Sequence, residues 1–297
     1  MVRILVSGAF GFIGSPLTSF FSSIGHEVVP LVRNSDKKTS AIIWDPEREL
    51  ANPEDFEGFD AVFHLAGEPL TFSRWSHEKK KKIFDSRVQG TSFLSRTLAS
   101  LDHPPKLFLS ASACGFYGDR KEEILTEKSE AGRGFLAEVC SAWEEASFAI
   151  AKRGSRVVHT RFGIVLGPNG GSVQKMLPFY KLGFGGKLGS GKQWMSWIAL
   201  QDLIRALVHI LQNESLQGPV NVVSPHPVRQ EIFAKTLAEL LHRPSFFHSP
   251  AWALRLGLGA TADELLLGSS RVQPVKLLES NFLFQYPDVR SALLNAL

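Results

Sequence analysis

The sequence predicts an α/β protein, in which a doubly wound parallel sheet is covered by helices and followed by a smaller, mainly helical C-terminal region. Short aliphatic runs recur up to about residue 225, and they alternate with segments whose apolar residues recur at helical spacing. Strands that are apolar throughout are typical of a parallel sheet buried on both faces. We therefore expect a sheet domain at residues 1–225, with a glycine-rich loop at 168–200, and a C-terminal domain at 226–297.

The chain opens with the pattern of a strand, a glycine-rich turn, a helix and a second strand. Residues 2–6 are aliphatic and short, as expected for a buried strand. The helix that follows carries Pro16 in its first turn, where a missing N–H costs little, and Gly25 marks its end. Residues 27–32 form the second expected strand.

The same alternation continues through the sheet domain. The apolar runs predict further strands, and the helical periodicities between and after them predict helices. The expected strands are residues 60–65, 106–109, 156–162 and 220–223. A polar helix with apolar positions at 83, 88, 93, 94 and 98 is expected after the first of them, and further helices are expected at 135–150 and 232–241. After residue 225, prolines and glycines punctuate the helices, so this part is expected to pack on the sheet domain without a tether.

Composition and charge exclude several classes of protein. Hydrophobic residues make up 44% and charged residues 21%, so the chain is neither disordered nor collagen-like. The net charge of +4 is too small to predict a nucleic-acid partner, and the longest basic run, at residues 79–82, is flanked by Glu78 and Asp85, as on a solvated helix face. The two cysteines, Cys114 and Cys140, provide neither a disulfide framework nor a usual zinc site.

Hydropathy gives no sign of a membrane-spanning segment, because no stretch of 18 apolar residues occurs. The apolar run after Arg3 is broken by glycines at 8, 11 and 14, which favours a structural role over a signal peptide. We expect a cytoplasmic monomer or homodimer with a small-molecule partner and with no membrane or nucleic-acid partner.

The turn after the first strand is the strongest functional signal. It reads Gly8-Ala-Phe-Gly11-Phe-Ile-Gly14, a GxxGxxG between a strand and an amphipathic helix. Glycine is needed where the strand turns, where the backbone approaches a pyrophosphate and where the helix packs on the strand. Because the N–H groups of the following helix face such a phosphate, the turn predicts a dinucleotide site. The alternative is a glycine-rich packing turn without a ligand.

The end of the second strand favours NADP over NAD. An NAD site places Asp or Glu there for the ribose 2′-hydroxyl. This chain has Arg33 and then Asn34, while Asp36 lies too far past the strand. A guanidinium at Arg33 is suited to the 2′-phosphate of NADP(H). The alternative is that Arg33 is an ordinary surface arginine.

Several motifs in order along the chain resemble one family. They are GAFGFIG, HLAGE at 64–68, SASACGFYG at 110–118, RFGIVLG at 161–167 and GSGKQWMSWIALQDL at 189–203. Together they resemble the extended short-chain dehydrogenases/reductases of the NAD(P)-dependent epimerase/dehydratase family. More narrowly, residues 269–287 resemble the C-terminal domain of unknown function of the atypical sugar-nucleotide-epimerase-like group. The resemblance implies a Rossmann-type fold, with the 168–200 loop and the C-terminal domain on the substrate side.

The resemblance also implies which residues contact the cofactor. They comprise the phosphate turn, the ends of the second and third expected strands, one helix residue and the segments near the nicotinamide: Gly8, Phe10, Gly11, Phe12, Ile13, Gly14, Val32, Arg33, Leu65, Ala66, Gly67, Arg87, Ser110, Phe162 and Gly163. In the same comparison, Ser112 aligns with the family's catalytic serine.

One departure from the family puts the reaction in doubt. The superfamily uses a tyrosine and, four residues later, a lysine as its proton relay. Leu136 and Cys140 occupy those positions here. We take Ser112, Tyr117 and Glu68 as replacement candidates, although Tyr117 also suits a packing role and Glu68 a capping role.

Three functions are compatible with this pattern. The first is an NADP-dependent oxidoreductase or epimerase-like enzyme acting on a small molecule, and the glycine-rich loop with Trp75, Trp194 and Trp197 favours a substrate site. The second is a non-catalytic NADP(H)-binding sensor, which the missing Tyr–Lys pair favours. The third is an interaction protein, for which the residues give no chemical support.

Overall fold

The computed structural model describes residues 1–33 and 41–297. Among these residues, seven strands form one parallel sheet in the order β12-β7-β5-β4-β1-β2-β3. The strands are β1 (Arg3–Ser7), β2 (Glu27–Val32), β3 (Ile42–Ile43), β4 (Ala61–His64), β5 (Leu107–Ala113), β7 (Arg156–Phe162) and β12 (Gly218–Val222). The chain builds outward from β1 in one direction and from β4 in the other, so the order reverses between them. Ligands bind outside the carboxyl ends of the strands at such a reversal.

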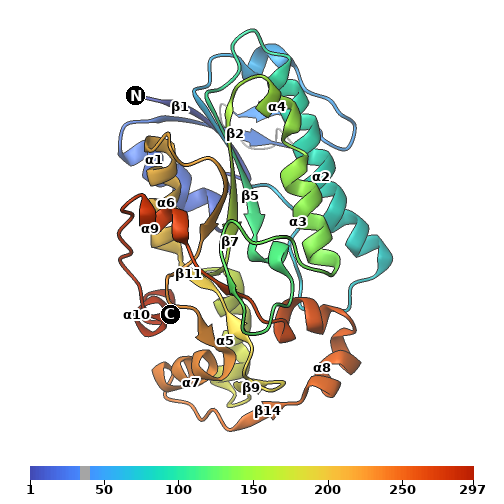
Figure 1. The fold of residues 1–297 in the computed structure, drawn as a ribbon, viewed down its shortest axis with the longest axis vertical. Coiled ribbons are helices and arrows are strands. Elements are labelled where there is room, and N and C mark those ends of the chain that lie inside the picture. Colours follow the sequence, from blue (N-terminus) through green and yellow to red (C-terminus); the bar gives the residue numbers. More distant parts are fainter. Residues whose placement is uncertain (34–40) are drawn as a thin grey trace.

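Helices cover both faces of the sheet, which confirms the doubly wound prediction (Figure 1). One face packs on α1 (Gly14–Ser23) and α6 (Leu200–Gln212), and the other packs on α2 (His77–Ala99), α3 (Phe135–Glu145) and α4 (Phe148–Lys152). Ile4 and Val6 face the first layer and Leu5 faces the second, as the alternation of a strand requires. All three side chains are completely buried.

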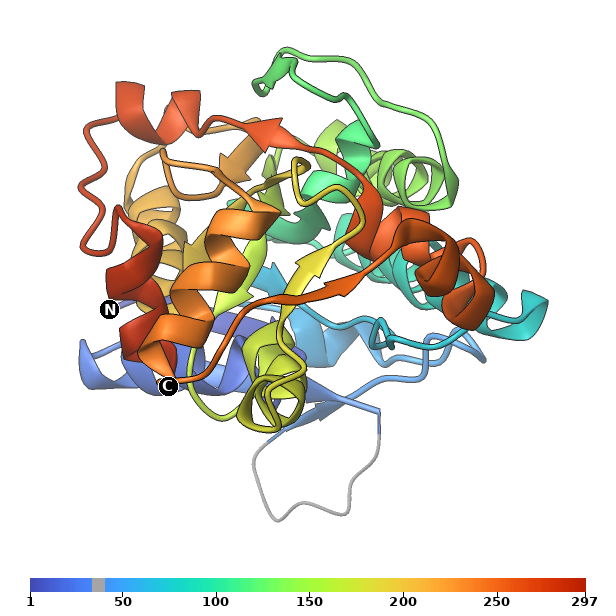
Figure 2. The same ribbon diagram turned by 90° about the horizontal axis from the view of Figure 1, so that it is seen from below.

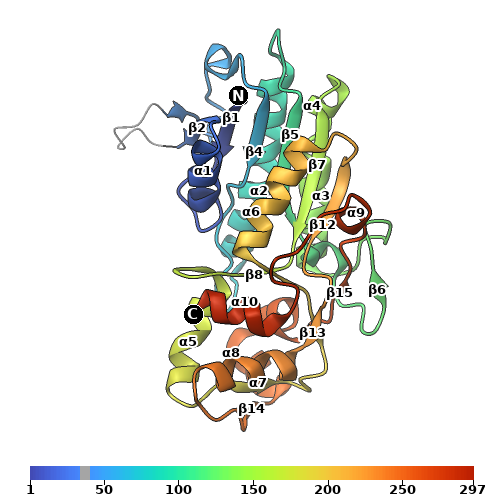
Figure 3. The same cartoon turned by 90° about the vertical axis from the view of Figure 1, so that its left-hand side faces the viewer.

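A second lobe lies beyond the carboxyl ends of the sheet strands (Figure 3). It has its own core, built by α5, α7, α10 and the strands between them. Its elements are β8 (Ile164–Leu166), α5 (Gly171–Lys181), β9 (Gly186–Leu188), β10 (Trp194–Met195), β11 (Trp197–Ala199), β13 (Val228–Arg229), α7 (Gln230–Leu240), β14 (Phe247–Ser249), α8 (Ala251–Leu258), a π-helical turn (Asp263–Leu267) and α10 (Val289–Ala296). The 168–200 loop is therefore largely regular structure that shares a core with the C-terminal residues.

Part of the C-terminal region returns to the sheet domain. β15 (Arg271–Val272) pairs with β6 (Ile124–Leu125), and α9 (Val275–Glu279) packs beside β12. Leu277 and Phe282 enter the same core as α1 and α6. The two lobes are thus joined by strand pairing and by shared apolar packing, without a free linker.

The structure gives the bounds of α2 and corrects one expected helix. α2 begins at His77, where the Ser76 hydroxyl accepts a hydrogen bond from the Lys79 N–H and caps it, so the basic run at 79–82 lies on this helix as expected. The helix expected at 135–150 is interrupted at Ala146 and Ser147. The Ser147 hydroxyl donates to the Glu144 carbonyl oxygen and also contacts His159 Nε2 at 2.7 Å, so it competes with the helical backbone. No helix in the described residues is long and apolar enough to cross a membrane.

Candidate functional site

The three glycines of the phosphate turn have different surroundings. Gly8 has φ +70°, and a Cβ there would lie 3.0 Å from the Ala66 nitrogen, so this position packs on the end of β4. A Cβ at Gly14 would lie 2.1 Å from the Gly8 carbonyl oxygen, so this position packs α1 on the turn. At Gly11, a Cβ would meet that same oxygen at 3.2 Å and no other atom of the described residues within 4 Å. The other side of Gly11 is therefore open with respect to the described residues, as a backbone that receives a pyrophosphate must be.

A buried serine and histidine hold the neighbouring strand end in place. Ser7 Oγ accepts hydrogen bonds from the N–H groups of Leu65 and Ala66 and lies 2.6 Å from His64 Nδ1. Because Oγ already accepts two bonds, its own proton goes to Nδ1, and the ring proton belongs on Nε2. Nε2 has no hydrogen-bond partner within the described residues. Burial lowers the pKa of His64 to about 4, so the ring is neutral at pH 7.

Phe12 connects the phosphate turn to the second lobe. A Cβ at Gly170 would lie 2.5 Å from the Phe12 ring, and one at Gly171 would lie 2.7 Å from it. The ring therefore fills the space that these glycines leave before α5. The second lobe is in direct contact with the turn, while Phe10 is half exposed beside it.

Arg33 lies just past β2, with a side chain that is 70% exposed. Among the described residues, its ion-pair partner is Glu47, at 3.9 Å, and this side chain is also exposed. Such an exposed contact contributes little, so Glu47 does not keep the guanidinium from binding a phosphate. Asn34 and Asp36, the other residues weighed at this strand end, lie outside the described residues.

Arg87 lies against the end of β4. Its guanidinium carbon is 3.5 Å from where a Cβ of Gly67 would be, and it lies 5.1 Å from the centre of the Trp143 ring. Its Nη1 donates to the carbonyl oxygens of Glu68 and Ile83. Burial lowers the pKa of Arg87. Arg87 makes no ion pair among the described residues, because the Glu68 carboxylate pairs with Lys79 at 2.6 Å instead.

Ser112 and Tyr117 belong to one buried network. The Ser112 hydroxyl donates to Glu144 Oε1 at 2.7 Å, and Arg161 grips the same carboxylate through two hydrogen bonds of 2.8 and 2.7 Å. Arg161 also donates to the Tyr117 hydroxyl, which in turn donates to Asn221. Burial raises the pKa of Tyr117. Neither hydroxyl has a free proton to offer, so a catalytic role for either stays a prediction.

The positions of the missing Tyr–Lys pair are apolar. A Cβ at Gly115 would lie 3.3 Å from Leu136 Cβ and 3.7 Å from Cys140 Sγ, so Gly115 faces both. Burial raises the pKa of the Cys140 thiol to about 12, which leaves it neutral. Ser112 faces Glu144, one helical turn beyond Cys140. The aligned serine therefore contacts α3 about one turn beyond Cys140 and about two turns beyond Leu136.

The remaining residues singled out from the sequence lie either at strand ends or in the buried core. Phe162 ends β7 and Gly163 follows it, where a Cβ would lie 2.7 Å from the Ser196 carbonyl oxygen. Ser110 is completely buried in the sheet, with its hydroxyl donating to the Ala111 carbonyl. Trp197 is buried in the core of the second lobe, and Val32 ends β2.

Several contacts that shape the site could not be expected from the sequence, although some of their residues lie in recognised motifs. Arg161 begins the RFGIVLG motif, but its pairing with Glu144, 17 residues earlier, follows only from the packing of α3 beside the sheet. Glu264 gave no sequence signal, and its carboxylate accepts hydrogen bonds from the N–H groups of Phe135 and Leu136 and so caps α3. His64 begins the HLAGE motif, and Ser7 directly precedes the phosphate turn.

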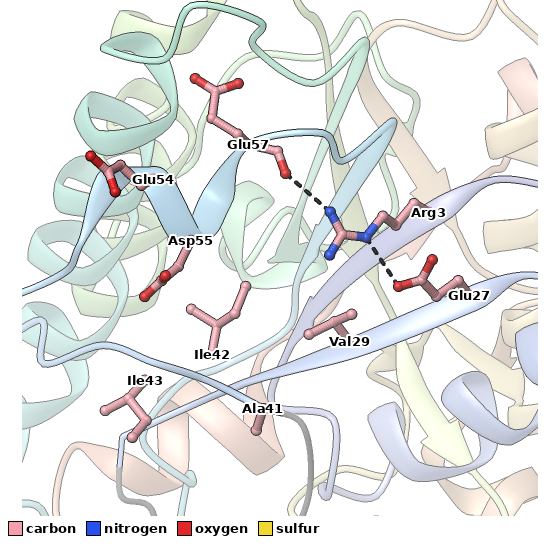
Figure 4. Close-up of a pocket in the computed structure, with 9 residues that line it drawn as sticks. All are labelled: Arg3, Glu27, Val29, Ala41, Ile42, Ile43, Glu54, Asp55 and Glu57. Atoms are coloured by element: carbon pink, nitrogen blue, oxygen red, sulfur yellow. Dashed lines mark hydrogen bonds and ion pairs between the residues drawn. The ribbon is translucent and has the colours of Figure 1, made fainter.

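A separate cavity of about 540 Å³ lies at the end of the sheet where β1 and β2 begin, away from the phosphate turn (Figure 4). Arg3 and Glu27, the first residues of β1 and β2, pair across it at 3.0 Å. Since ligands of open α/β sheets bind at the carboxyl ends of the strands, this cavity is not the dinucleotide site.

The fold and the phosphate turn define a dinucleotide-binding α/β protein with a second lobe over the cleft. Residues 4–223 match the NAD dependent epimerase/dehydratase family, and residues 249–296 match a domain of unknown function, DUF1731. The chain belongs to the NAD-dependent epimerase/dehydratase family, as the sequence motifs predicted.

Similar proteins agree with this assignment. The epimerase family protein Mb2239 of Mycobacterium bovis is 37% identical over 290 residues, covering 98% of this chain and 96% of that protein. The structure of the human epimerase family protein SDR39U1 with NADPH has a TM-score of 0.91 and 30% identity, covering 99% of this chain and 98% of that one. Thermus thermophilus UDP-glucose 4-epimerase in complex with NAD shares the fold, with a TM-score of 0.75 and 19% identity over 99% of this chain and 97% of that one.

Proposed function

We propose that this protein binds NADP(H) at the carboxyl ends of β1 and β4 and acts as an oxidoreductase or epimerase-like enzyme on a small molecule. The observation that carries the proposal is the open outer side of Gly11, next to two glycines that are packed against protein. The SDR39U1 structure supports the phosphorylated cofactor, because it contains NADPH. When bound, the cofactor supplies or accepts a hydride.

Different residues of the chain would bind different parts of the cofactor. The phosphate turn and the first turn of α1 receive the pyrophosphate, and Arg33 receives the 2′-phosphate. Ser7 and His64 fix the backbone of Leu65 and Ala66, which passes the cofactor.

Arg87 is suited to replace the missing lysine as the local cation. It contributes to the electrostatics of the Cys140 thiol, the position where the family has its lysine. A guanidinium without an ion-pair partner favours a polar or anionic group of a ligand beside it. We assign Arg87 to the nicotinamide half of the cofactor.

A non-catalytic NADP(H)-binding sensor is the second candidate. The apolar contact of Gly115, Leu136 and Cys140 favours it, since the Cys140 thiol is the one titratable group there and burial raises its pKa to about 12, far above that of a useful acid or base at pH 7. The proton relay typically contributes about 10²–10⁴-fold to a rate, so its absence predicts slow turnover on ordinary substrates.

A two-step experiment separates the two candidates. NADPH oxidation is screened against carbonyl compounds and nucleotide sugars, and each hit is repeated with Ser112→Ala, Tyr117→Phe and Glu68→Gln. A lower kcat in one variant, with unchanged NADPH affinity, supports the enzyme function and identifies the substituted side chain as the one that transfers the proton. Tight NADPH binding without turnover across the panel supports the sensor, and absence of NADPH binding refutes both.

A further inference from the structure

The far end of the second lobe exposes large apolar side chains, which we call the distal face. They come from the end of α5 and the turn after it, from the β14 segment and from α8: Phe179, Leu182, Phe184, Phe246, Phe247, Trp252 and Leu256. Phe246 is 84% exposed, and Trp252 and Leu256 are 70% and 73% exposed. α8 has the sequence AWALRLGL; four of its eight residues are partly buried and none is fully buried. Trp252 and Leu256, one helical turn apart, leave a large apolar surface exposed, and such a surface marks an interaction site.

The segments of the distal face are neighbours in space. β14 pairs in parallel with β9, which follows the turn after α5. The rings of Phe184 and Phe247 lie 5.8 Å apart, and Pro244 lies beside Gly183. α8 begins two residues after β14 ends, and β14 and the start of α8 lie at the end of the molecule away from the sheet strands (Figures 1 and 2). The C-terminal end of α8 turns back toward the sheet domain, where Arg74 donates to the Leu256 carbonyl oxygen.

The same segments carry only positive charge. Residues 171–192 contain four lysines and residues 240–262 contain two arginines, and neither segment contains an aspartate or a glutamate. The whole chain has 29 acidic residues in 297, so this absence is local. A groove beside Phe246 and Phe247 is lined by one acidic residue, Glu231, and by two basic residues, Lys187 and Lys235. Arg255 of α8 pairs with Asp263 from the π-helical turn.

We propose that the distal face docks on an anionic lipid surface. Phenylalanine, tryptophan and leucine insert at the boundary between headgroups and acyl chains, while lysine and arginine hold the anionic headgroups. Lysines can lay their aliphatic stems along the apolar surface and keep the charge in water. The charge argues against a second copy, because a two-fold contact would place two positive faces against each other.

This proposal goes beyond the cofactor site and does not depend on it. It replaces the expectation of no membrane partner, which rested on the absence of a spanning segment. A peripheral contact needs no such segment, since short loops and one amphipathic helix reach only about 5–10 Å into the interface.

The test is co-sedimentation of the full-length protein with vesicles. One set contains phosphatidylcholine alone, and the other contains phosphatidylcholine with phosphatidylglycerol. We expect binding to the anionic vesicles that weakens at high salt, and little binding to the neutral ones. The variant Phe246→Ser/Trp252→Ser is expected to bind the anionic vesicles about tenfold more weakly, because two apolar anchors are lost.

Two controls keep the result interpretable. Leu283→Ser removes an equally exposed apolar side chain outside the distal face and is expected to bind vesicles like the wild type. The melting temperature and the NADPH affinity of both variants report whether the fold is intact. Equal vesicle binding by the double variant and the wild type would overturn the proposal. So would absence of vesicle binding together with a wild-type dimer that the double variant loses, which would identify a second copy as the occupant.

Discussion

Arg33 is the residue on which the choice of cofactor depends. Its guanidinium is exposed beyond β2 and has no strong protein partner among the described residues. Arg33→Glu is expected to weaken NADPH binding by roughly tenfold to 150-fold, since one charge-assisted contact contributes about 1.5–3 kcal/mol. NADH binding should change little. Calorimetric titration of both cofactors measures this, and an equal loss for both would refute the assignment.

Arg87 is expected to act on the other half of the cofactor. Arg87→Gln should lower NADPH affinity by about tenfold, the lower range of a charged contact, and Arg87→Lys should lose less because it keeps the charge. Adenosine 2′,5′-bisphosphate lacks the nicotinamide half and serves as the matched ligand. Its affinity should be unchanged by Arg87→Gln but lowered by Arg33→Glu. If Arg87→Gln weakens both ligands equally, Arg87 has only a structural role.

His64 makes stability depend on pH. Its pKa is about 4 in the folded protein and 6.5 when unfolded, so the unfolded chain binds more protons between these values. The neutral His64 ring therefore contributes fully to the free energy of unfolding above pH 6.5. This contribution is lost as the pH falls toward 4, and the total loss is at most about 3 kcal/mol.

Urea unfolding between pH 7.5 and 4.5 measures that effect, with His64→Asn as the control. The asparagine side chain of this variant does not titrate and keeps an acceptor for Ser7. The wild type should lose more stability than the variant over this range, while His159, whose pKa burial also lowers, contributes to both. If the unfolding free energies of the wild type and the variant depend on pH with identical slopes, His64 is protonated in the folded protein without loss of stability.

At the scale of elements, α3 is the helix that departs from the family's proton relay. It carries Leu136 and Cys140 instead of the proton relay, and its first N–H groups are held by Glu264 from the C-terminal region. This cap ties the helix beside the cleft to the second lobe.

Glu264→Ala should therefore destabilise the protein by about 1 kcal/mol, as the loss of a helix cap does. The unfolding free energy in urea measures this, with Glu130→Ala on an exposed loop as the control. NADPH affinity should be unchanged. A Glu264→Ala variant as stable as the control would mean that water caps α3 equally well.

The sheet was predictable because its signals are local. Apolar runs mark β1, β2, β4, β5 and β7, and a GxxGxxG after the first of them locates the phosphate turn. The break in the helix at Ser147 was not predictable, since it depends on His159 from β7. For the same reason the Ser112–Glu144–Arg161 network was missed: its members meet only after three elements have packed.

At the scale of the whole molecule, the second lobe closes over the turn that identifies the family. Phe12 packs against the glycines at the start of α5, and Glu264 caps α3, so the second lobe contacts both the phosphate turn and the helix that carries the relay positions. The apolar residues Leu136 and Cys140 at the relay positions depart from the Tyr–Lys pattern of the superfamily.

The central claim is that the cleft at Gly11 and Arg33 is an NADP(H) site. Its most direct test is calorimetric titration of the purified protein with NADPH and with NADH, using Gly11→Val as the control that fills the open side of the turn. We predict tighter binding of NADPH than of NADH, and no binding of either by a Gly11→Val variant that melts like the wild type. Equal affinity for the two cofactors, or retained binding by Gly11→Val, would contradict the account.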